Sequence, residues 1–290
     1  MLVSRRSLLS MLGGVAAGPA FAAPGVQSRI REGAAWTVYY GTAASPDAFA
    51  PYSLAVLDPN YARAGEVAKK SETTVLGYVS LGELNTSNPF APLLRDRGML
   101  VSENPNWPGS VSVDLRHIAW RQYILDEIIP RLLAAGFDGL FLDTLDSALH
   151  LETLNPDRFS GMQGAAQALI ADIRGAHPNI PIMMNRAYAL LPEVNVHIDA
   201  ILTESLVTTY DFAEHRYKWV DDATFVHHLA LLRPAQLGLH TVPVYSLDYW
   251  DPGDADGIAA IYARQRALGH NPYVATILLD QLVPEPAHDR

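Results

Sequence analysis

The 290-residue sequence contains no cysteine, so the stability of the fold must come from its core without disulfides. No apolar run is long enough to span a bilayer as a helix, and we expect no membrane span. Gly-x-Gly-x-x-Gly does not follow the first predicted strand, and Gly-x-Ser-x-Gly, His-Glu-x-x-His and a phosphate-binding loop are also missing. These absences argue against a dinucleotide fold, a serine hydrolase and a zinc protease, and we expect neither cofactor nor metal.

Basic residues are also scarce, with 21 Lys and Arg against 31 Asp and Glu and a net charge of −10. Such a chain repels nucleic acid and favours a neutral or cationic partner. The adjacent pair His227 and His228 lies about 100° apart on a predicted helix, which does not suit one metal ion. We expect a monomer.

The first 22 residues predict a secretory signal. Arg5 and Arg6 precede an apolar run over residues 11–17, and Ala20-Phe21-Ala22 has the small-x-small pattern of a cleavage site. The paired arginines favour the twin-arginine type over an ordinary signal. Removal of residues 1–22 takes away two arginines and no acid, so the net charge goes from −10 to −12. We expect an exported protein, periplasmic or extracellular, with a mature domain over residues 23–290.

Eight short apolar runs predict strands, and helical spacing separates most of them. This layout predicts an α/β fold, a (β/α)8 TIM barrel in a single domain, with a doubly wound sheet as the alternative. We expect residues 85–114 to form a long irregular segment. Pro130 predicts a kink in the helix over 118–135, and Ser160 is expected to cap the next helix. The predicted strands are 36–40, 54–57, 74–79, 140–142, 181–184, 200–203, 241–245 and 272–276.

Two acids stand directly after predicted strands, Asp143 after the run Leu140–Leu142 and Glu204 after residues 200–203. In a parallel barrel, residues at the carboxyl ends of strands meet at the mouth where chemistry takes place. Two facing carboxylates are the requirement for glycoside hydrolysis, because one protonates the leaving oxygen and the other attacks or activates water. For Asp146 we expect a structural role and not a catalytic one.

Other polar and aromatic residues close to predicted strand ends are candidates for binding a sugar. Aromatic rings stack on the apolar faces of sugars, and Trp107 and Trp250 are further candidates for stacking. The candidate substrate-binding residues are Tyr40, Asp58, Tyr78, Glu83, Asn185, Tyr210, Tyr245, Asp248 and Tyr249.

Five segments together resemble one enzyme family. They are Gly136-Phe-Asp-Gly-Leu-Phe-Leu-Asp143-Thr-Leu-Asp146, Tyr78-Val-Ser-Leu-Gly-Glu83, Val113-Asp114-Leu-Arg116, Ile201-Leu-Thr-Glu204-Ser and Val244-Tyr-Ser-Leu-Asp248-Tyr249. In this order, over nearly the whole mature chain, they resemble the endo-α-1,4-polygalactosaminidases of glycoside hydrolase family 114.

The resemblance implies a (β/α)8 fold and cleavage of α-1,4 linkages in galactosamine-rich polymers, which are cationic when deacetylated. It places the two catalytic acids at Asp143 and Glu204. Of these we assign Asp143 as nucleophile or base and Glu204 as general acid. The alternative is a secreted glycan-binding protein without catalytic activity, because folds of this kind can lose activity and keep binding. Such a protein would tolerate the loss of Asp143.

Overall fold

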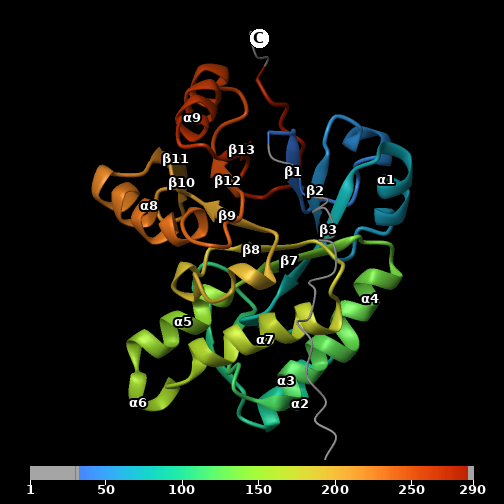
Figure 1. The fold of residues 1–290 in the computed structure, drawn as a ribbon, viewed down its shortest axis with the longest axis vertical. Helices are drawn as coiled ribbons and strands as arrows, with labels where there is room; N and C mark the ends of the chain where they lie inside the picture. Colours follow the sequence, from blue (N-terminus) through green and yellow to red (C-terminus); the bar gives the residue numbers. More distant parts are fainter. Residues whose placement is uncertain (1–29, 31–32, 287–290) are drawn as a thin grey trace, which may run out of the picture.

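The computed structural model describes residue 30 and residues 33–286, and the expected signal at residues 1–22 lies outside them. Eight parallel strands form one nearly closed barrel with helices between most of them (Figure 1). The predicted single-domain (β/α)8 barrel is confirmed. In sheet order the strands are β1 (Trp36–Tyr39), β2 (Leu54–Leu57), β3 (Thr74–Ser80), β7 (Gly139–Asp143), β8 (Ile182–Asn185), β9 (Ala200–Glu204), β12 (Val244–Tyr249) and β13 (Asn271–Ala275).

Among the described residues, β13 and β1 meet through separate hydrogen bonds instead of a strand ladder. The Tyr40 amide donates to the Leu279 carbonyl at 2.6 Å. At the other end of the seam, the Trp36 indole N–H donates to the Asn271 carbonyl at 3.0 Å. A few contacts therefore join the first barrel strand to the last.

Alternate strand residues fill the barrel, and the residues between them face the helices, as a period of two requires. The barrel floor is aromatic. The Trp36 ring meets Tyr245 edge-on at 5.2 Å and Tyr273 at 5.7 Å between centroids. These rings close the amino end of the barrel and leave the carboxyl end for the site.

Helices of different length cover the outside of the barrel (Figure 1). Two connections, β1 to β2 and β8 to β9, contain only short 3-10 turns. Within the described residues, no helix has both the length and the apolarity needed to cross a bilayer. The covering elements are η1 (Pro46–Phe49), α1 (Ala64–Ser71), α3 (Ile118–Tyr123), η2 (Ile124–Ile128), α4 (Ile129–Ala134), α5 (Leu145–Leu154), α6 (Pro156–Phe159), α7 (Met162–Ala176), η3 (Tyr188–Leu190), η4 (Asn195–His197), α8 (Asp222–Gln236) and α9 (Ala255–Ala267).

Proline and glycine explain two helix boundaries. The predicted break at Pro130 takes the form of a π-helical turn, η2, between α3 and α4. Pro130 has no N–H to donate to the preceding turn, and the widened turn accommodates this loss. The predicted cap at Ser160 is wrong, because Gly161, with a φ of 92°, occupies the N-cap position of α7.

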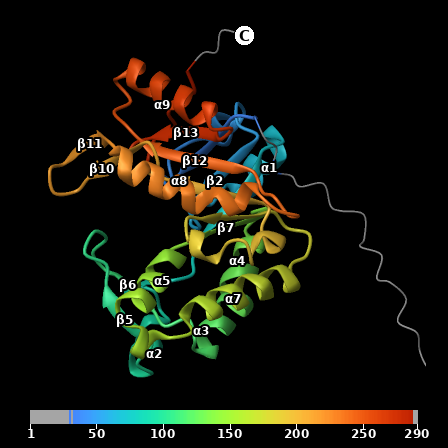
Figure 2. The same ribbon diagram turned by 60° about the vertical axis from the view of Figure 1, so that its left-hand side comes forward.

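Two excursions leave the carboxyl end of the barrel and project to the left in Figure 2. The first, after β3, contains much of the segment predicted to be irregular and forms a small antiparallel sheet in the order β4-β6-β5. The second, after β9, is an antiparallel hairpin that the sequence analysis did not predict. Their elements are β4 (Glu83–Asn85), α2 (Ala91–Asp96), β5 (Leu100–Glu103), β6 (Ser110–Val113), β10 (Thr208–Asp211) and β11 (Arg216–Trp219).

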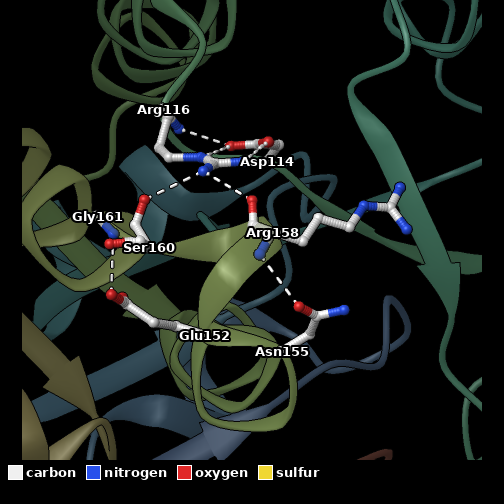
Figure 3. A network of polar contacts seen from close by, with 7 residues as sticks. All are labelled: Asp114, Arg116, Glu152, Asn155, Arg158, Ser160 and Gly161. Atoms are coloured by element: carbon white, nitrogen blue, oxygen red, sulfur yellow. Dashed lines mark hydrogen bonds and ion pairs between the residues drawn. The ribbon is translucent and has the colours of Figure 1, made fainter.

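Arg116 ties the first excursion to the helical layer (Figure 3). Its guanidinium donates to both oxygens of Asp114, at 2.9 and 2.6 Å. It also donates to the carbonyls of Arg158 and Ser160, at 3.0 and 3.1 Å. The Asp114-Leu-Arg116 motif is thus accounted for as a structural brace between the end of β6 and the α6–α7 junction.

Candidate active site

Three neighbouring strands end in polar side chains that face the barrel mouth. Asp143, Asn185 and Glu204 are the last residues of β7, β8 and β9. The residue two positions earlier on each strand belongs to the interior cluster, so the alternation of the strand turns all three end residues inward. The two predicted acids therefore lie at one site, with Asn185 on the strand between them.

One amide nitrogen joins the two carboxylates. Asn185 Nδ2 donates to Asp143 Oδ1 at 2.8 Å and to Glu204 Oε2 at 2.7 Å. Because both bonds share that nitrogen, the two accepting oxygens lie no farther apart than the combined length of the bonds. Asn185 is only 4% exposed, and its Oδ1 has no hydrogen-bond partner among the described residues.

The chain turns sharply after each of these strands. Thr144, Arg186 and Ser205, the residues that directly follow the three end residues, have φ values of 64°, 50° and 57°. A side-chain-bearing residue rarely adopts this left-handed conformation, and it costs about 1–3 kcal/mol at each position. Backbone strain of this kind is typical of functional sites.

The turn after β7 is fixed by a glycine and a hydroxyl. Thr144 Oγ1 accepts the amides of Gly82 and Glu83 at 2.8 and 3.2 Å. A Cβ on Gly82 would lie 2.0 Å from the Thr144 carbonyl oxygen, so only glycine permits this approach. The Ser-Leu-Gly-Glu motif after β3 thereby holds the backbone that carries Asp143.

Three tyrosines surround the carboxylates. The Tyr249 hydroxyl donates to Glu204 Oε1 at 2.6 Å. The Tyr40 and Tyr78 rings meet edge-on at 5.3 Å, and burial together with the nearby charge of Asp143 raises the pKa of both hydroxyls. Burial and the charge of Glu204 raise the pKa of Tyr249 in the same way. The three hydroxyls therefore stay protonated and serve as donors.

The carboxylates hold a proton at unusually high pH. Burial and the negative charge of Glu204 raise the pKa of Asp143 to about 7, while the hydrogen bond from Asn185 acts in the opposite direction. Two carboxyl groups this close do not both ionise readily, so the pair retains one proton near neutral pH. The site can therefore supply both a proton donor and an ionised carboxylate.

The sequence analysis missed one charged neighbour, Arg186, although it directly follows Asn185. Its guanidinium pairs with Asp146 at 3.3 Å. This pairing gives Asp146 the structural role expected of it. A cavity of about 390 Å³ is lined by Arg186 and reaches Ser205, Lys218 of the hairpin and His228 of α8.

Glu83 lies near the mouth, but protein donors occupy its carboxylate. It accepts hydrogen bonds from Asn104 Nδ2 at 3.0 Å and from the hydroxyls of Ser110 and Ser147 at 2.5 Å each. Its side chain thus joins β4, the β5–β6 region and α5. We therefore remove Glu83 from the substrate-binding candidates.

We also remove Asp248 and Tyr245 from the substrate-binding candidates. Asp248 faces out of the barrel, where it is 1% exposed and accepts the amides of Val207 and Thr208 at 2.8 Å each and the side-chain amide of Gln265 at 2.6 Å. Tyr245 lies in the aromatic floor.

The two remaining candidates lie outside the immediate site. Asp58 accepts both the backbone and the side-chain amide of Asn60, at 2.7 and 3.0 Å. Tyr210 lies on the β10–β11 hairpin between Phe212 and Tyr217. The residues that the structure brings together are Asp143, Asn185, Glu204, Tyr40, Tyr78 and Tyr249. Over the described residues, no cluster of three or more His, Asp or Glu could hold a metal.

The sequence matches the model of glycoside-hydrolase family GH114 over residues 17–289. An uncharacterized protein of Deinococcus radiodurans is 26% identical over 250 residues, which span 80% of this chain and 76% of that protein.

Two solved structures are similar to this chain over most of its length. The glycoside hydrolase domain of PelA from Pseudomonas aeruginosa superposes with a TM-score of 0.75 at 28% identity, over 87% of this chain and 98% of that domain. Aspergillus fumigatus Ega3, in complex with galactosamine, superposes with a TM-score of 0.65 at 15% identity, over 92% of this chain and 100% of that one. The second likeness concerns the fold alone.

Proposed function

Because the chain belongs to glycoside hydrolase family GH114 and is a glycosidase, we propose that it cleaves α-1,4 linkages in galactosamine-containing polysaccharide. The galactosamine bound to Ega3 supports this choice of sugar. The net charge of −10 also suits a polymer that carries protonated amino groups.

The observation that carries the mechanism is the amide nitrogen of Asn185 shared by Asp143 and Glu204. Retaining glycosidases place their two carboxyl groups about 5–5.5 Å apart, whereas inverting enzymes leave about 6.5–9.5 Å for a water molecule. Since the accepting oxygens lie within the combined length of two bonds of 2.8 and 2.7 Å, the separation supports retention.

The pair shares one proton, and the first step starts from the form in which that proton lies on Glu204 and Asp143 is ionised. Asp143 then attacks the anomeric carbon while Glu204 gives the proton to the departing oxygen, so that a C–O bond to the enzyme forms and the glycosidic bond breaks. In the second step, Glu204 takes a proton from water, the water oxygen bonds to the anomeric carbon, and Asp143 leaves as a carboxylate. The Tyr249 hydroxyl and Asn185 orient Glu204 throughout.

The test is incubation of the mature chain with acetylated and deacetylated galactosamine polymers, with mass spectrometry and NMR of the products. We expect shorter oligomers with retained α configuration from the chain, and none from Asp143→Asn or Glu204→Gln. With an aryl glycoside that needs no acid assistance, Glu204→Ala should still form the glycosyl-enzyme and Asp143→Ala should not. Inverted products would exclude this mechanism.

The non-catalytic alternative makes the opposite prediction, because it requires that the polymer bind and remain intact.

We also propose that the mature chain works outside the cytoplasm, on the strength of the twin-arginine pattern at Arg5 and Arg6. The mass of the exported protein should match cleavage after Ala22, and an uncleaved cytoplasmic product would contradict export.

A further inference from the structure

The two excursions touch each other above the site. Trp107 lies in the turn between β5 and β6, and Phe212 lies in the turn of the β10–β11 hairpin. Their rings meet edge-on, 5.6 Å apart and inclined at 78°. The excursions start from β3 and β9, which flank β7 and β8 in the sheet, so this contact joins segments on either side of the strands that carry Asp143 and Asn185.

Both rings are exposed for apolar groups of their size, 49% for Trp107 and 38% for Phe212. Their turns are nevertheless well braced. The Gly109 amide donates to Glu103 at 3.0 Å next to Trp107, and Asp211 Oδ1 accepts the amides of Ala213 and Glu214 at 3.0 Å each next to Phe212. Partly covered rings on braced turns present an apolar surface that can bind another apolar group.

A line of aromatic contacts leads from these tips towards the catalytic carboxylates. Phe212 meets Tyr210 at 5.3 Å, Tyr210 meets Tyr217 at 5.1 Å, and Tyr217 meets Trp250 at 6.4 Å. Tyr217 packs against the interior cluster of the barrel, as Tyr40 and Tyr78 of the site do. The exposed pair at the tips is therefore continuous with the site where the glycosidic bond is cleaved.

We propose that Trp107 and Phe212 form a glycan clamp, a binding site for sugar residues of the polymer beyond those at the point of cleavage. The rings separate to admit the chain and stack on the apolar faces of its pyranose rings. This inference rests on the proposed polysaccharide substrate. It assigns a binding role to the clamp and no part in bond cleavage.

The first test compares a long galactosamine polymer with a trisaccharide that fills only the catalytic subsites. Trp107→Ala should lower kcat/KM on the polymer by about tenfold, equivalent to about 1.4 kcal/mol, through KM, and leave the trisaccharide unaffected. Trp107→Phe should restore the flat ring and most of the effect, whereas Trp107→Leu, which restores only apolar bulk, should not. Leu239→Ala, at a side chain that is 99% exposed, serves as the control.

Equal activity of Trp107→Ala and the native chain on the polymer would overturn the clamp. Rescue by Trp107→Leu would also overturn it, because that result would indicate a purely structural ring. If the native chain cleaves neither substrate, the proposed function fails first, and that outcome is distinct from both of these.

The second test locks the clamp. Because the sequence has no cysteine, Trp107→Cys with Phe212→Cys introduces one unique thiol pair, which a short bis-maleimide can join. The linked protein should lose internal cleavage of the polymer and keep cleavage of the trisaccharide, while the unlinked double variant should keep partial activity on the polymer and full activity on the trisaccharide. Unchanged polymer cleavage after linking would show that the chain does not enter between these two tips.

Discussion

Asn185 couples the two carboxylates, and within the part of the chain that the structure describes its side-chain Oδ1 is buried without a hydrogen-bond partner. The structure thus leaves one acceptor unsatisfied in order to direct both amide protons at the acids. Leaving a buried polar atom unpaired costs about 1–3 kcal/mol, so the arrangement is better explained by catalysis than by stability.

We expect Asn185→Ala to lower kcat by about 10²–10³-fold, the usual effect of removing a preorganised donor. The hydrogen bond from Asn185 lowers the pKa of Asp143 in opposition to burial, so its loss should raise that pKa further and move the acidic limb of the pH–rate profile upwards. Rate measurements from pH 4 to 9 test this, with Asn60→Ala, which removes an exposed amide bonded to Asp58, as control. An unshifted acidic limb would count against the coupling.

The raised pKa of Asp143 also makes the stability of the fold depend on pH. In the unfolded chain this carboxyl ionises near its ordinary value of about 3.9, whereas in the fold its pKa is about 7. The fold therefore binds this proton more tightly than the unfolded chain, and stability is lost as pH rises from about 4 to about 7.

Asp143→Asn should accordingly be more stable than the native chain at pH 8, by roughly 2–4 kcal/mol, and nearly equal to it at pH 4. Thermal unfolding at both values of pH measures the difference. A constant difference across this range would mean that Asp143 is ionised throughout.

At the scale of elements, the brace at Arg116 is expected to matter for stability and not for chemistry. Arg116→Met removes the paired bonds to Asp114 and the bonds to two carbonyls, and should cost about 2–3 kcal/mol of unfolding free energy. Arg131→Met, in the exposed pair with Glu127, should cost less than about 0.5 kcal/mol. Denaturant unfolding and kcat on the trisaccharide test both statements, and a large loss of kcat at full stability would contradict the structural role.

Strand boundaries explain where the sequence analysis went wrong about the site. Residues 241–245 were expected to form the seventh barrel strand, whereas β12 runs from Val244 to Tyr249. Pro243 cannot donate a ladder hydrogen bond, so the central strand starts after it. The strand end therefore moves from Tyr245 to Tyr249, and the alternation turns Asp248 outward. Asp143 and Glu204 were predictable because their strands are short apolar runs that end at the acid.

At the scale of the whole molecule, the barrel follows from local pattern, and the excursions do not. The eight strands are buried on both faces and have a strong apolar signal. The small β4-β6-β5 sheet and the β10–β11 hairpin are short and partly exposed. The first excursion is rich in turn residues, and the hairpin strands have only four residues each. The contact between Trp107 and Phe212 joins residues more than a hundred positions apart.

The junction between β13 and β1 makes the barrel strands unequal in the number of strand ladders that each one forms. Removing an inner strand would break two strand ladders, whereas removing the first or the last strand would break one ladder and a few isolated hydrogen bonds. In a fully closed barrel, the loss of any strand would break two ladders. Among the described strands, the barrel is therefore expected to open most easily between β1 and β13, because only isolated hydrogen bonds hold that junction.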